Sequence, residues 1–87
     1  MNYRVTWHAD ILDALAGFYV EADTADRDRM AGGVDALNRR LADDPHAVGE
    51  SRESEIRIAF LPLLMIRFRV DDCQRTVRVV GVGRFGR

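Results

Sequence analysis

Alternating apolar and polar side chains open the chain. Tyr3, Val5 and Trp7 are separated by polar residues over positions 3–8. A period of two, carried by aromatic and β-branched side chains, is typical of a half-buried strand. The sequence therefore predicts a first strand at residues 3–8.

Two stretches of helical periodicity follow this strand. In the first, Asp10 can cap a helix through its carboxylate, and the apolar residues after it recur three and four positions apart: Ile11, Leu12, Leu15, Phe18, Tyr19 and Ala22. In the second, Thr24 is the predicted N-cap and the apolar stripe is Met30, Val34, Leu37 and Leu41.

The second helix is expected to end before Pro45. Gly32-Gly33 in its middle indicates either close packing against the first helix or a break in the second. Because only a few residues separate the two helices, we expect them to form an antiparallel hairpin.

The second half of the chain predicts three more strands after an irregular polar loop at residues 45–54. Within 55–60, the expected core face is Ile56, Ile58 and Phe60, with Ala59 outward. Within 64–70 the expected core face is Leu64, Ile66, Phe68 and Val70, and within 77–82 it begins with Val77 and Val79. Short connections between these strands favour an antiparallel meander.

These elements predict an α+β fold in the order strand-helix-helix-strand-strand-strand, as a single domain over residues 1–87. We expect the helical hairpin to pack on one face of an antiparallel four-stranded sheet. Arginines occupy the opposite face in this interpretation: Arg57, Arg67, Arg69 and Arg78. Apolar residues on that face (Ala59, Met65, Val80 and Val82) could add to a contact surface for a partner.

Composition narrows the class of protein. The chain has 87 residues, 47% of them hydrophobic and 31% charged, which is typical of a globular domain. The longest apolar run, at 59–66, is too short to cross a membrane. No secretory signal opens the sequence, and the single Cys73 cannot form an internal disulfide, so we expect a cytoplasmic protein. Such a small core favours a partner or a homodimer.

Charge is distributed unevenly along the chain. Residues 1–44 carry five Arg and nine acidic residues, a balance of −4, whereas residues 45–87 carry eight Arg and five acidic residues, a balance of +3. All thirteen basic residues are Arg, a side chain suited to bidentate contact with phosphate. The second half could therefore face a polyanion, although a solvated surface explains the same arginines.

Candidate chemistry is sparse. His8 and His46 lie far apart with no acidic partner at ligand spacing, so we expect no metal site and no cofactor. Asp71 and Asp72 beside Cys73 would raise the pKa of its thiol, which argues against a reactive nucleophile. Arginine can stabilise charge developing on a phosphate, but it stays protonated and supplies no general base.

The whole pattern resembles the RelE/ParE toxin superfamily of bacterial type II toxin–antitoxin systems. The resemblance rests on the opening strand, Asp10, the hairpin closed by Asp44-Pro45, the loop 49–52, and the closing segments 66–72 and 76–84. It implies a toxin neutralised by a cognate antitoxin protein. One branch of the family cleaves mRNA on the ribosome without a metal, and another inhibits DNA gyrase.

The endonuclease branch implies roles for six arginines. By resemblance, the catalytic residues would be Arg57, Arg84 and Arg87. If the protein cuts RNA, the nucleic-acid-binding residues would be Arg52, Arg67 and Arg69. The chain departs from the family pattern in having Met65 where an Arg is common, in lacking a Tyr after the basic C-terminal stretch, and in a pI near 6.1. A non-catalytic binding protein, either a gyrase inhibitor or a degenerate toxin, is therefore the alternative.

Overall fold

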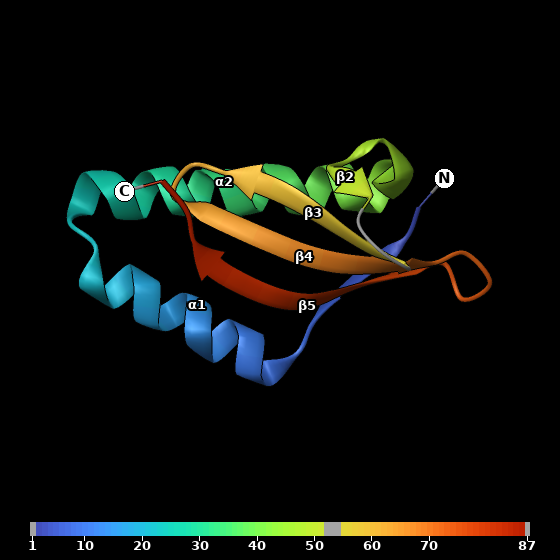
Figure 1. Ribbon diagram of the computed structural model, residues 1–87, viewed down its shortest axis with the longest axis horizontal. Coiled ribbons are helices and arrows are strands. Elements are labelled where there is room, and N and C mark those ends of the chain that lie inside the picture. Colours follow the sequence, from blue (N-terminus) through green and yellow to red (C-terminus); the bar gives the residue numbers. More distant parts are fainter. Residues whose placement is uncertain (1, 52–54, 87) are drawn as a thin grey trace.

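The computed structural model describes residues 2–51 and 55–86 and consists of two helices packed against a mixed five-stranded sheet (Figure 1). The elements in chain order are β1 (Arg4–Trp7), α1 (Ala9–Glu21), α2 (Thr24–Asp43), a 3-10 turn η1 (Pro45–Ala47), β2 (Glu50–Ser51), β3 (Ile56–Leu61), β4 (Leu64–Asp71) and β5 (Thr76–Arg84). The predicted α+β class is confirmed, and the two helices and four of the five strands follow one another in the predicted order.

Both helices are capped earlier than predicted: His8 rather than Asp10 caps α1, and Asp23 rather than Thr24 caps α2. The side chain of His8 accepts from the backbone N–H of Asp10 at the start of α1, and Asp23 accepts from the N–H of Asp26 at the start of α2. The helix α2 runs unbroken through Gly32-Gly33. A Cβ at Gly33 would lie 3.0 Å from Cδ of Pro62, so this glycine allows close packing on the β3–β4 turn rather than on α1.

The sheet has five strands in the order β1-β5-β4-β3-β2, not the four antiparallel strands expected. Strands β3, β4 and β5 form the predicted antiparallel meander, but β1 pairs parallel with β5. Connection length predicted the meander; it does not determine the partner of a first strand that is separated from the others by two helices.

The added strand β2 lies within the predicted polar loop and pairs with Arg57 and Ile58. Gly49 permits this approach because its φ is +71° and a Cβ there would overlap the carbonyl oxygen of Ile58.

The core lies between the helices and one face of the sheet. Buried side chains of α2, of the sheet and of the segment after η1 form its larger part: Leu37, Leu41, Val48, Ala59, Ile66, Phe68, Val77 and Val79. A second group joins α1, α2 and β4 through Leu15, Met30, Val34 and Leu64. No helix among the described residues is long and apolar enough to cross a membrane.

The predicted facing of β3 is wrong. The two-residue turn at Pro62-Leu63 pairs Leu61 with Leu64 and so places Ala59 opposite Ile66. Because directly paired residues share a face, Ala59 joins the core, with only 5% of its surface exposed. Arg57 therefore lies on the helix side of β3, whereas Ile56, Ile58 and Phe60 lie on the open face. Val82, expected outward, packs against the core.

Candidate functional site

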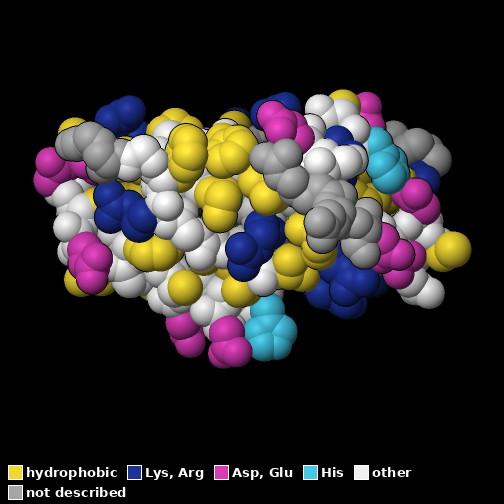
Figure 2. All heavy atoms as spheres, viewed as in Figure 1, with side chains coloured by type: hydrophobic (Ala, Val, Ile, Leu, Met, Phe, Trp, Pro, Cys, Tyr) yellow, Lys and Arg dark blue, Asp and Glu magenta, His cyan; other side chains and the backbone are white. Residues whose placement is uncertain are grey.

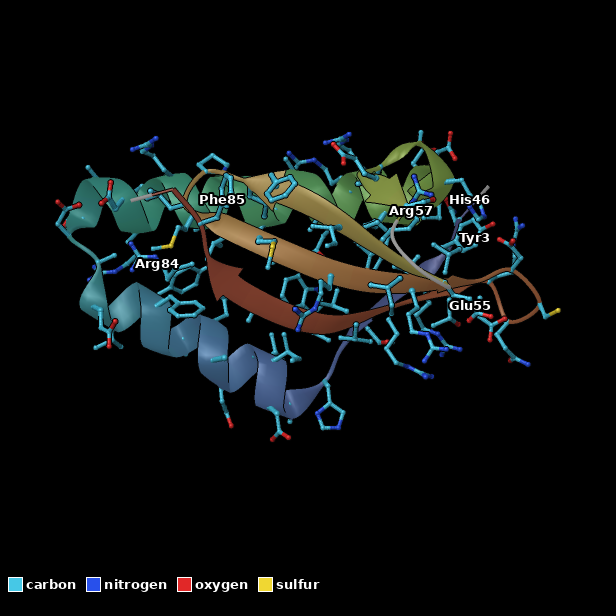
Figure 3. All side chains as sticks on the ribbon, viewed as in Figure 1. Tyr3, His46, Glu55, Arg57, Arg84 and Phe85 are labelled. Carbon is cyan, nitrogen blue, oxygen red and sulfur yellow. The ribbon has the colours of Figure 1, made fainter. Side chains whose placement is uncertain are left out.

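Two side chains from distant parts of the chain meet on one carboxylate oxygen of Asp72. The hydroxyl of Tyr3 donates to Oδ1 of Asp72 at 2.7 Å, and Nε2 of His46 lies 2.8 Å from the same oxygen. The guanidinium of Arg75 lies 4.8 Å from the centre of the Tyr3 ring. We call Tyr3, His46, Asp72 and Arg75 the Asp72 cluster; Figure 3 labels two of its members, Tyr3 and His46.

The parallel pairing of β1 with β5 brings this cluster together. Arg4 pairs with Thr76, and the N–H of Arg4 donates to the carbonyl of Arg75 at 2.9 Å. Tyr3 therefore lies beside the β4–β5 turn that carries Asp72. Pro45 starts the 3-10 turn after α2, and this turn supplies His46.

The pKa shifts in the Asp72 cluster indicate which groups donate and which accept its hydrogen bonds. Hydrogen bonds from Tyr3 and then His46 lower the pKa of Asp72, while the hydrogen bond to Asp72 raises the pKa of Tyr3. Asp72 is thus an ionised acceptor at neutral pH, and Nε2 of a neutral His46 must carry the proton that it donates. Nδ1 of His46 then holds a lone pair, and no described residue forms a hydrogen bond with it.

The guanidinium of Arg57 binds the backbone of residues 46–51, the segment beside the Asp72 cluster. It donates to the carbonyl oxygens of Val48, His46 and Gly49 at 3.0, 3.1 and 3.2 Å, and to Oγ of Ser51 at 2.9 Å. These contacts use four of the five N–H groups that an arginine carries. In this structure Arg57 thus holds residues 46–51 against β3.

Three arginines line the open face of the sheet. Arg69 of β4 pairs in register with Arg78 of β5, and its guanidinium forms an ion pair with Glu55 at 3.1 Å. Arg67 lies over Gly81, where a Cβ would come within 2.5 Å of its guanidinium. Arg67 and Arg69 therefore share one face, as the sequence predicts, and Arg78 joins them.

Arg84 lies at the opposite end of the sheet from Arg57 (Figure 3). Arg57 pairs with Phe68 of β4, whereas Arg84 pairs with Leu64, four residues away along the strand. At about 3.3 Å per residue, this separates them by roughly 13 Å along β4 alone. The structure therefore does not bring these two predicted catalytic residues together. Arg52 and Arg87 lie outside the described residues.

An apolar patch occupies the open face beside these arginines. Phe60 and Phe85 are 44% and 47% exposed, and their ring centres lie 4.6 Å apart. Met65 pairs with Phe60 in register, on the same face. Figure 2 shows apolar side chains gathered over β3 and β4 with basic side chains among them.

Two hollows adjoin the Asp72 cluster and share Glu55 and Val70. One, of about 220 Å³, is lined by His46, Ser51, Glu55, Ile56, Arg57 and Val70. The other, of about 470 Å³, is lined by Glu55, Arg69, Val70, Asp71, Asp72, Cys73, Thr76 and Arg78. Within residues 2–51 and 55–86, no three His, Cys, Asp or Glu side chains are grouped as metal ligands would be.

Sequence reasoning missed Tyr3, His46 and Asp72 as a group. Tyr3 reads as a strand residue, His46 as a loop residue and Asp72 as part of a polar turn. No spacing rule joins positions so far apart along the chain, so the sequence carries no signal for the cluster.

The fold was compared with those of known proteins. No family sequence model matches the chain, and no curated protein sequence matches it. The toxin–antitoxin complex RelBE2 from Mycobacterium tuberculosis contains a chain with a TM-score of 0.73 and 20% identity, over 98% of this chain and 100% of that one.

Two further complexes contain chains of similar fold. A chain of the chromosomal ParDE system from P. aeruginosa gives a TM-score of 0.67 at 16% identity, over 97% of each chain. A chain of the archaeal RelE–RelB complex from Pyrococcus horikoshii gives 0.63 at 19% identity, over 100% of this chain and 99% of that one. The chain therefore has, over nearly its whole length, the fold of the RelE/ParE toxin–antitoxin structures.

Proposed function

We propose that this protein is the toxin of a type II toxin–antitoxin system and that a cognate antitoxin protein holds it inactive. The supporting observation is the similarity of fold over nearly the full length of chains from the RelBE2, ParDE and RelE–RelB complexes. We expect the pair to work in the cytoplasm, where mRNA is translated.

We further propose that the toxin cleaves mRNA on the ribosome without a metal. The open-face arginines Arg67, Arg69 and Arg78 supply adjacent cationic groups suited to a phosphate backbone. Arg84, Arg87 and Arg52 are assigned to phosphate contact as further predictions. Arg57 is assigned to positioning, since its donors hold the segment that carries His46.

Inhibition of DNA gyrase is the second candidate. The similarity to a chain of the ParDE system favours it, as does the exposed pair Phe60 and Phe85, which suits contact with a protein surface. In that function the open-face arginines would serve binding rather than catalysis.

Reconstituted translation of a defined mRNA separates these candidates. Primer extension should show cuts within codons only when ribosomes are translating and the purified protein is present. A parallel supercoiling assay with gyrase should show no inhibition. Intact mRNA together with inhibited gyrase would overturn the endonuclease proposal. Intact mRNA and unaffected gyrase would indicate a degenerate toxin without either activity. Separately, the mass of the purified protein in solution would show whether it forms a homodimer.

A further inference from the structure

We propose that His46, held by Asp72, is the general base of RNA cleavage by this protein. This inference rests on the proposed endonuclease function and supplies the group that arginines cannot provide, because a guanidinium stays protonated. Histidine is the side chain whose ordinary pKa lies close to neutral pH, so it can accept a proton there and release it again.

The pairing of His46 with Asp72 prepares the imidazole for this role. Oδ1 of Asp72 accepts from Nε2 at 2.8 Å, which fixes the tautomer and leaves the lone pair on Nδ1. The hydroxyl of Tyr3 donates to the same oxygen at 2.7 Å and so orients the carboxylate. His46 remains accessible, since 53% of its side chain is exposed, compared with 62% for Asp72.

The surroundings of His46 combine a fixed backbone with cationic groups. Arg57 donates to the carbonyl of His46 at 3.1 Å and lines the same hollow, which has room for part of a nucleotide. Among the described residues, the charged and titratable groups around the imidazole are Asp72, Tyr3, Arg57, Glu55 and Arg75, with Asp44 two positions earlier in the chain. Glu55 is a weaker candidate for the base because its carboxylate is paired with Arg69.

The proposed step is an in-line displacement at phosphorus. Nδ1 of His46 takes the proton from a ribose 2′-hydroxyl, and the resulting oxygen nucleophile forms a bond to the adjacent phosphorus. The bond from phosphorus to the 5′-oxygen of the next nucleotide breaks, and that oxygen takes a proton from water. The hydroxide that remains takes the proton from Nδ1 of His46, which restores the base. The products are a 2′,3′-cyclic phosphate and a 5′-hydroxyl end, with no net oxidation or reduction.

Cleavage of ribosome-bound mRNA by His46→Ala tests the assignment. The substitution keeps the backbone carbonyl that Arg57 contacts and removes one of the two hydrogen bonds to Asp72, so we expect a folded variant that melts somewhat below wild type. The cleavage rate should fall by about 100-fold or more, and added imidazole should restore part of it. The wild-type rate should rise with pH through the range in which a histidine deprotonates, and His46→Ala should lose this rise.

His8→Asn is the matched control, since it removes the other histidine while keeping a side chain able to cap α1. It should cleave at the wild-type rate. If His46→Ala fails to fold, Asp72→Asn takes its place and should slow cleavage and change the pH profile. A folded His46→Ala that cleaves within threefold of wild type, with the same pH profile, would overturn the assignment and leave the endonuclease function intact. If the wild-type protein itself does not cleave, the proposed function fails and this inference fails with it.

Discussion

Arg57 holds His46 by its backbone: the guanidinium of Arg57 donates to the carbonyl oxygen of His46 at 3.1 Å. This contact is one of four that fasten residues 46–51 to β3. The sequence assigns Arg57 to contact with phosphate. In the structure its guanidinium instead stabilises the segment next to the Asp72 cluster.

Replacement of Arg57 by Ala should therefore destabilise the fold. The substitution removes a charged donor from the backbone carbonyls of residues 46, 48 and 49. We expect it to lower the free energy of unfolding by about 2–4 kcal/mol. Urea unfolding followed by circular dichroism measures this value. Arg69→Ala, which removes one exposed ion pair, is the control and should cost less than about 1 kcal/mol. Equal small losses in both variants would show that the contacts of Arg57 with residues 46–51 do not stabilise the fold.

Asp72 should make the folded state less stable at acidic pH than at neutral pH. Hydrogen bonds from Tyr3 and His46 lower its pKa in the folded state. Its contribution is thus present above the unfolded pKa of about 4 and is lost as the pH falls through the lower folded value. Asp72→Asn should melt below wild type at pH 7, and the gap should narrow as the pH falls below the unfolded pKa of about 4. Asp28→Asn, which removes a carboxylate on α2, should show no such gap.

Tyr3 should make the folded state less stable at alkaline pH. Its pKa is raised by the hydrogen bond to Asp72, so its contribution is complete below the unfolded pKa of about 10 and is lost as the pH rises through the folded value. Tyr3→Phe should lower the melting temperature at pH 8 and show a shallower decline above pH 10 than wild type. Parallel declines in the two proteins would exclude this role for Tyr3.

Gly49→Ala should be among the more damaging small substitutions. The residue has a φ of +71°, and a Cβ would overlap the backbone oxygen of Ile58, which cannot move without breaking the β2–β3 pairing. We expect a loss of about 2 kcal/mol or more by urea unfolding. Gly32→Ala in α2 is the control, because open space surrounds it, and it should stabilise by up to about 1 kcal/mol.

The open-face arginines should determine how strongly salt weakens RNA binding. Replacing Arg67 and Arg78 together by Ala should reduce the slope of log affinity against log salt by roughly 1.4, about 0.7 for each phosphate that is no longer neutralised. Fluorescence anisotropy with a single-stranded RNA measures the slope. Arg29→Ala on α2 should leave it unchanged. An unaltered slope in the double variant would remove this face from RNA binding.

Local patterns predicted the elements well and the strand faces only in part. The spacing of Met30, Val34, Leu37 and Leu41 correctly predicts the buried stripe of α2. The alternation in β4 is also correct, because each of its core residues is large and apolar. In β3, however, the small Ala59 is buried and the large Phe60 is exposed. The turn at 62–63 determines that register, and hydrophobicity alone points to the opposite face.

The candidate site was less predictable than the fold. Tyr3 and Asp72 are 69 positions apart, and His46 and Asp72 are 26 apart, so only the assembled sheet brings them together. The sequence correctly indicated that cations gather on β4, but it could not show that the donors of Arg57 point to backbone carbonyls. Side chains that act through the tertiary fold leave no local pattern to read.

The parallel pairing of β1 with β5 also constrains when the protein can fold. Val5 and Val77 are partners although 72 positions separate them, and β5 lies between β1 and β4 in the sheet. A nascent chain that still lacks β5 leaves β1 without its partner and the apolar face of β4 incompletely covered. Such long-range pairing is slow, on the scale of milliseconds to seconds. The first strand synthesised must therefore wait for β5, and the sheet can close only after β5 has left the ribosome.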